Sequence, residues 1–79
     1  MVLYYPINMV NVLCKKVGRR ICHHRKKKGF SQEELALMAY VDRTYLARIE
    51  EGKTNPSIRI LSKIAKYLQI KTYLLLIDI

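Results

Sequence analysis

The chain has 79 residues, which is enough for one small domain and leaves no room for a second. It carries 15 Lys and Arg against 6 Asp and Glu, a formal net charge of +9, while 51% of its residues are hydrophobic. This half-apolar composition indicates a folded domain rather than a basic disordered tail, and a domain this small rarely builds the cleft of an enzyme. We therefore expect a binding protein whose partner is an anion, with nucleic acid favoured over an acidic membrane surface.

Helical spacing of apolar residues and the usual stop signals predict the first two elements. Residues 12–28 are expected to form the first helix, which Gly29 ends. Ser31 followed three residues later by Glu34 is a capping box, and it opens a short second helix.

Two further helices follow the same rules. Asp42 is expected to cap a third helix over residues 43–51, which Gly52 stops. Asn55 with Pro56 behind it precedes a fourth helix that begins at Ile58. Because no strand alternation is found, the chain is predicted to be all-α.

Neither a metal site nor catalysis is expected. Cys14 and Cys22 are eight residues apart on one predicted helix, about 12 Å, so they are expected to be free thiols. His23 and His24 beside Cys22 diverge around the helix, and no second cluster completes a metal site. No Ser, His and Asp grouping converges, so we expect a protein that is not an enzyme and that needs no cofactor. Without a secretory signal or a membrane span, a cytoplasmic protein is expected.

Residues 32–51 are predicted to form a helix-turn-helix, whose second helix enters a DNA major groove. Its outward face is expected to carry Arg43, Thr44, Ala47 and Arg48. Arg43 has the planar fork that donates to guanine O6 and N7 together, while Thr44 offers a methyl and a hydroxyl to thymine or phosphate. Ala47 permits close approach, and Arg48 reaches another base or the backbone. The alternative is a solvated surface with two incidental arginines.

Three stretches carry a family resemblance: VGRRICHHRKKKGFSQEELA, VDRTYLARIEEGKTNPS and IRILSKIAKYLQI. Over about residues 17–76 the chain resembles the lambda-repressor-like, Cro-like (XRE-type) helix-turn-helix regulators. The resemblance implies a compact five-helix bundle and a homodimer on a near-palindromic double-stranded DNA operator, with no small-molecule ligand. The segment VDRTYLARIE and the short length look most like the controller proteins of restriction–modification systems, which autoregulate. Phage-type repressors and antitoxins of the same fold are the alternatives.

The resemblance also implies roles for single residues. Gln32 matches a phosphate-binding position, and the base-reading positions are Arg43, Thr44 and Arg48. The family's loop that grips the DNA backbone corresponds to Lys53, Thr54 and Asn55. Its structural ion pair corresponds to Arg25 and Glu50. The family usually has glycine where this chain has Tyr40, so a left-handed turn there is expected to cost roughly 1–2 kcal/mol.

Other charged residues have two interpretations each. Lys26 to Lys28 lie near the start of the second helix, where Lys28 is predicted to bind phosphate, and the alternative is a solvated face. A solvated face is the favoured interpretation for the four earlier basic residues of the first helix: Lys15, Lys16, Arg19 and Arg20. Glu33 and Glu34 are interpreted as helix-capping residues, with contact to RNA polymerase as the alternative.

The C-terminal residues are more apolar than a four-helix core requires. Dimerisation is predicted through Tyr73, Leu74, Leu76 and Ile77, and the alternative is a membrane-seeking end. Residues 1–10 are predicted to be an N-terminal extension, and residues 11–79 the DNA-binding domain with its C-terminal dimerisation helix. From another class of function, the rival is a basic helical module that binds an acidic partner protein or RNA.

Overall fold

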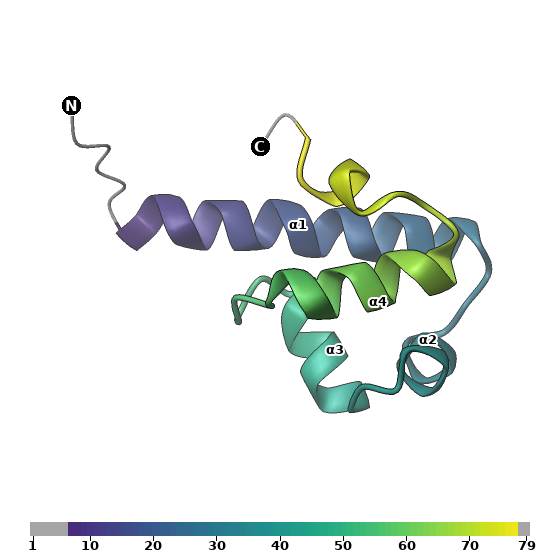
Figure 1. The fold of residues 1–79 in the computed structure, drawn as a ribbon. Coiled ribbons are helices and arrows are strands. Elements are labelled where there is room, and N and C mark those ends of the chain that lie inside the picture. Colours follow the sequence, from purple (N-terminus) through teal and green to yellow (C-terminus); the bar gives the residue numbers. More distant parts are fainter. Residues whose placement is uncertain (1–6, 78–79) are drawn as a thin grey trace.

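A computed structural model describes residues 7–77, and this part of the chain is entirely helical. Its elements are α1 (Ile7–Lys27), α2 (Gln32–Ala39), α3 (Arg43–Glu50), α4 (Ile58–Leu68) and the one-turn 3-10 helix η1 (Thr72–Leu75). Figure 1 shows α1 along the length of the molecule, with the other elements packed against its C-terminal part and its first turns projecting beyond them. The projection accounts for the elongated extents of 43 × 23 × 20 Å.

The first helix is longer than the sequence predicted. It begins at Ile7 instead of residue 12 and ends at Lys27. Residues 7–17 contain no glycine or proline, so nothing in this stretch interrupts the backbone hydrogen bonds of a helix.

Each of the four described α-helices is followed by a residue at positive φ: Gly29, Tyr40, Gly52 and Gln69. The hydrogen bonds are those of a Schellman motif, in which the next residue donates to a carbonyl five positions back. Val41 N–H donates to the Ala36 carbonyl at 2.9 Å in this way. Two helix ends therefore use glycine, for which positive φ is unstrained, and two use a residue with a Cβ.

The core draws on every element. Its largest fully buried side chains are Ile21, Leu35, Leu46, Ile49, Ile64, Leu68 and Leu75. Leu75 belongs to η1, so burial of this one side chain fixes the C-terminal segment against α1 and α4.

The fifth helix implied by the family resemblance is not an α-helix. Residues 72–75 form a single 3-10 turn, closed by Leu74 N–H to the Lys71 carbonyl and Leu76 N–H to the Tyr73 carbonyl. So short a segment forms too few hydrogen bonds to offset the cost of starting an α-helix. The bundle of the described residues is thus four α-helices and η1.

The division into residues 1–10 and 11–79 stays a prediction, because residues 1–6 and 78–79 lie outside the described part of the chain. Within residues 7–77, no helix combines the length and the apolarity that crossing a membrane requires.

Candidate nucleic-acid interface

The start of α2 is fixed by the capping box that the sequence predicted. The Ser31 hydroxyl accepts from Glu34 N–H at 3.0 Å, and the Glu34 carboxylate accepts from Ser31 N–H at 2.9 Å. The backbone hydrogen bond from Ser31 holds the pKa of Glu34 below its usual value. The carboxylate of Glu34 is therefore occupied in the cap, whereas Glu33 is exposed beside it.

The turn between α2 and α3 is left-handed at Tyr40, in spite of the cost expected for a residue with a Cβ. Tyr40 adopts φ 59° and ψ 45°, and its side chain is 90% exposed. Asp42 takes the extended backbone of an N-cap, but its side chain makes no capping hydrogen bond, so this part of the prediction is wrong. The entry to α3 is therefore held by backbone hydrogen bonds and by half-buried Val41 rather than by a side-chain cap.

The third helix divides into a buried and an exposed side. Leu46 and Ile49 lie in the core, while Arg43, Thr44 and Arg48 are exposed and Ala47 is half-buried. The four outward positions share one face, where side chains at i, i+1, i+4 and i+5 lie together. This face combines two guanidinium groups, a hydroxyl and one small residue.

A buried ion pair holds the C-terminal end of α3 against α1. Arg25 Nε donates to Glu50 Oε2 at 2.8 Å and its Nη2 to Glu50 Oε1 at 3.0 Å, a bidentate arrangement. Arg25 also donates to the Phe30 carbonyl at 2.8 Å. The hydrogen bond to Glu50 raises the pKa of Arg25. The pair ties α1, the α1–α2 turn and α3 together.

Two of the residues predicted to bind phosphate already have protein partners. Gln32 Nε2 donates to Glu50 Oε1 at 3.1 Å, and Lys28 Nζ donates to Gln69 Oε1 at 3.0 Å. A side-chain amide carries two N–H groups, so Gln32 has one left after its bond to Glu50. Both side chains are held in place by these contacts and retain hydrogen-bond donors.

The predicted phosphate-gripping loop follows α3. Lys53 and Asn55 are exposed and Thr54 is half-buried. The Lys53 ammonium lies 3.0 Å from the Glu51 carboxylate, with both side chains more than half exposed, so this ion pair contributes little to stability.

Three further residues determine how these elements pack or begin. A Cβ on Gly18 would overlap the carbonyl oxygen of Ile49, so only glycine lets α1 approach α3 this closely. A Cβ on Gly52 would lie 2.6 Å from the Cα of Lys15. Ser57, and not Asn55, caps α4, since its hydroxyl accepts from Ile60 N–H at 3.1 Å. The available signals were a glycine inside a helical pattern and a serine just before one.

The side chains predicted for dimerisation lie at the C-terminal end. Tyr73, Leu76 and Ile77 are 55%, 37% and 47% exposed, whereas Leu74 is half-buried. Beside them an apolar groove runs between α1, the start of α4 and the segment after η1, lined by Leu13, Cys14, Val17, Asn55, Pro56, Ile58, Leu61 and Leu76. The predicted interface therefore continues into a groove that the sequence did not indicate.

The cysteines and histidines of α1 do not gather into a cluster. Cys14 and Cys22 are free thiols, and the rings of His23 and His24 meet edge to face at 5.3 Å. Across residues 7–77, no three His, Cys, Asp or Glu side chains are placed to hold a metal ion.

Comparison with known proteins identifies the family. A helix-turn-helix family model matches residues 24–75, which include α2, the turn, α3 and α4. The chain belongs to the XRE-type helix-turn-helix family. Among the curated members, the transcriptional regulator SinR of Bacillus subtilis is 44% identical over 61 residues, or 76% of this chain and 55% of SinR. The chain thus spans about half the length of this relative.

Solved structures of the family share the fold. The restriction–modification controller protein C.AhdI from Aeromonas hydrophila superposes with a TM-score of 0.77 at 37% identity, over 78% of this chain and 94% of that one. SinR in complex with DNA superposes with a TM-score of 0.73 at 44% identity, over 76% of this chain and 97% of that one. The family members that this chain resembles thus include a controller protein and a protein solved on DNA.

Proposed function

We propose that the protein is a sequence-specific DNA-binding transcriptional regulator that acts as a homodimer on a near-palindromic operator. The observation that carries the proposal is the exposed face of α3, which presents Arg43, Thr44 and Arg48 on a helix anchored by the Arg25–Glu50 pair. Arg43 would donate to guanine, with Thr44 and Arg48 reading neighbouring bases over the small Ala47. The proposed mechanism requires no cofactor, small-molecule ligand or catalysis.

Phosphate contacts would set the position of this helix on the duplex. Gln32 bonds to Glu50 at the C-terminal end of α3, and the loop residues Lys53, Thr54 and Asn55 follow that same end. Lys28 lies just before α2, where its side chain bonds to Gln69. Phosphate contacts fix the orientation of the protein without reading sequence. The bonds of Gln32 to Glu50 and of Lys28 to Gln69 support this role, since they hold the side chains before DNA arrives.

A homodimer would cover the apolar groove and the exposed Tyr73, Leu76 and Ile77, together with Leu74 at its edge. Ile58, 61% exposed at the rim of this groove, supports the same interface. A two-fold dimer places two recognition helices roughly 34 Å apart, one turn of DNA.

Within the family, we favour a restriction–modification controller that autoregulates, ahead of a phage-type repressor or antitoxin. The support is the match to C.AhdI, of which the chain covers 94%. A contact with RNA polymerase would use Glu33, because the carboxylate of Glu34 already accepts a hydrogen bond in the capping box.

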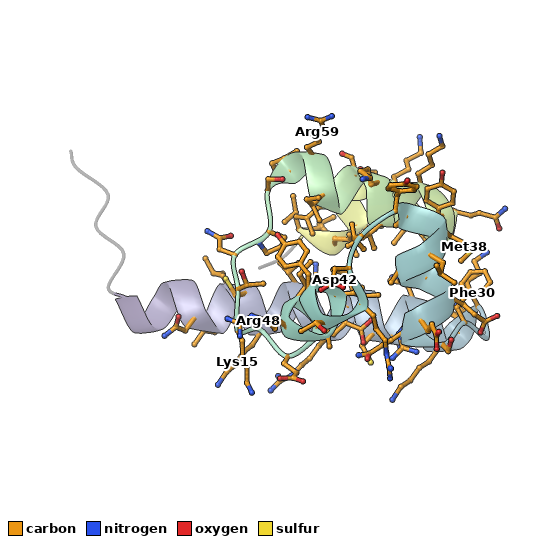
Figure 2. All side chains as sticks on the ribbon, turned by 90° about the horizontal axis from the view of Figure 1, so that it is seen from below. Lys15, Phe30, Met38, Asp42, Arg48 and Arg59 are labelled. Carbon is orange, nitrogen blue, oxygen red and sulfur yellow. The ribbon has the colours of Figure 1, made fainter. Side chains whose placement is uncertain are left out.

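The test is a gel shift with DNA from upstream of the protein's own gene, in competition with scrambled duplex. Arg43→Ala is compared with Arg59→Ala, since both remove one exposed arginine and Arg59 belongs to α4, outside the helix-turn-helix. Figure 2 shows Arg59 at the edge of the molecule away from Arg48. We expect Arg43→Ala to lose about 1–3 kcal/mol of specific affinity, roughly 5- to 150-fold, and to keep its non-specific binding. Arg59→Ala should bind like the wild type. Equal small losses from both variants would instead favour a module that binds acidic partners or RNA by charge alone.

A further inference from the structure

The two lysines at positions 15 and 16 lie on different sides of α1. Both are exposed, and both stand outside the helix-turn-helix. Successive residues of an α-helix are rotated by about 100°, so neighbours in sequence face different surroundings. The contacts of α1 show which side each lysine occupies.

Lys15 lies on the side of α1 that borders the end of α3. A Cβ built on Gly52 would lie 2.5 Å from the Lys15 Cγ and 2.6 Å from its Cα, so Lys15 packs directly on the turn after α3. One helical turn later, Gly18 packs in the same way on the backbone of Ile49 and Glu50.

Lys16 lies on the side that borders η1. Arg20 is four residues further along and so shares its face of the helix. The guanidinium of Arg20 donates to the Leu74 carbonyl at 3.4 Å, which places this face beside the C-terminal segment and away from α3. The two lysines therefore differ in their surroundings and match in charge and exposure.

We propose that Lys15 contacts a DNA phosphate beside the loop after α3 and so extends the nucleic-acid interface onto α1; the inference rests on the proposed DNA binding. Lys53 follows Gly52, and its N–H donates to the Arg48 carbonyl at 2.9 Å, so Lys15, Arg48 and Lys53 belong to one closely packed region. Figure 2 shows the labelled Lys15 and Arg48 on the same side of the molecule.

The charge balance of this region favours Lys15 as the phosphate ligand. The ammonium of Lys53 is 3.0 Å from the Glu51 carboxylate, whereas within residues 7–77 Lys15 has no carboxylate partner. A phosphate held by the loop would therefore lie near the ammonium of Lys15, whose charge no carboxylate of residues 7–77 offsets.

The salt dependence of DNA binding tests this assignment. The dissociation constant for a labelled mixed-sequence duplex is measured by fluorescence anisotropy for the wild type, Lys15→Gln and Lys16→Gln over about 50–200 mM salt. Lys15→Gln should reduce the slope of log K against log salt by about 0.9 and weaken binding about three- to ten-fold. Lys16→Gln, which removes the same charge, should keep the wild-type slope, and Lys15→Arg should restore it.

The outcomes separate this inference from the function on which it rests. Equal slopes for Lys15→Gln and Lys16→Gln would overturn the role of Lys15 and leave DNA binding intact. Failure of the wild-type protein to bind duplex at the lowest salt would overturn the proposed function as well. Circular dichroism melting of each variant checks that all are folded.

Discussion

The two ends of α3 are held in different ways. At the C-terminal end, Gly18 lets the backbones of α1 and α3 touch, and the buried Arg25–Glu50 pair joins the same two helices. At the N-terminal end, the chain arrives through exposed Tyr40 in a left-handed conformation, and Asp42 gives no side-chain cap. The end that carries Arg43 and would read bases is therefore the one with fewer side-chain restraints.

This difference indicates how the recognition helix is oriented. Contacts to α1 hold its C-terminal end, while contacts to α2 and the burial of Leu46 hold the part nearer Arg43 and Thr44. The N-terminal end presents exposed Arg43 and Thr44 directly before half-buried Tyr45 and buried Leu46. Substitutions at the two ends should consequently differ in their effect on stability.

The largest effect is expected from the buried pair. Glu50→Ala leaves the Arg25 charge buried without its partner, and should lower the free energy of unfolding by roughly 3–5 kcal/mol. Glu51→Ala breaks the exposed pair with Lys53, and should cost at most about 1 kcal/mol. Urea unfolding followed by circular dichroism measures both.

Replacing both members of the buried pair provides the control. Arg25→Met combined with Glu50→Leu removes both charges together, and should recover most of the stability that Glu50→Ala loses. A double variant as unstable as Glu50→Ala would show that lost packing, rather than the unpaired charge, causes the loss.

The next effect is expected at the crossing of α1 and α3. Gly18→Ala improves helix propensity by about 1 kcal/mol, but its Cβ would meet the carbonyl oxygens of Ile49 and Glu50. Because those atoms are backbone, α3 must shift, and a net loss of about 1–3 kcal/mol is expected. A gain in melting temperature would contradict the close approach of the two helices.

A smaller effect of opposite sign is expected at the N-terminal end. Tyr40→Gly should raise the free energy of unfolding by about 0.5–1 kcal/mol, because glycine adopts positive φ without strain. Gln69→Gly relieves the same positive φ at the end of α4 but also removes the acceptor of the Lys28 ammonium, so its gain should be smaller. Gly29→Ala should lose about 1 kcal/mol, although no atom lies within 4 Å of its new Cβ. Unchanged stability in Tyr40→Gly would argue against strain in the turn.

The smallest effect concerns pH. Burial, followed by the charges of His23, Lys27 and Arg20, lowers the pKa of His24 from its ordinary 6.5. As pH falls, His24 takes up a proton in the unfolded chain before it does so in the folded chain. The free energy of unfolding therefore keeps its full value with respect to His24 above pH 6.5, and it declines below that pH until the folded-state pKa is passed. His24→Gln should flatten the stability profile in that window. A profile that His24→Gln leaves unaltered would assign the acid sensitivity to other groups.

Much of this arrangement follows from local sequence signals. The capping box, the order of the four α-helices and the inward direction of Leu46 and Ile49 follow from short-range spacing, and the structure confirms them. The contacts that determine which parts of α1 reach α3 are long-range. Nothing within the sequence near Lys15 indicates Gly52, 37 residues later, and periodicity alone does not reveal how closely two helices cross.

The caps and the C-terminal segment show a second limit. Asp42 and Ser57 are both acceptable N-cap residues, yet only Ser57 forms the side-chain hydrogen bond, because backbone geometry decides between them. The apolar residues after Gln69 suggested a helix, but a short segment takes its conformation from the burial of Leu75.

Selection of DNA from a random duplex pool tests most directly whether the exposed face of α3 reads bases. The wild-type protein should enrich near-palindromic sequences with half-sites about 10 base pairs apart. Arg43→Ala should lose the preference at one position of each half-site, while Arg59→Ala keeps the full pattern. A wild-type pool that stays random, or an Arg43→Ala pool identical to that of the wild type, would contradict the account.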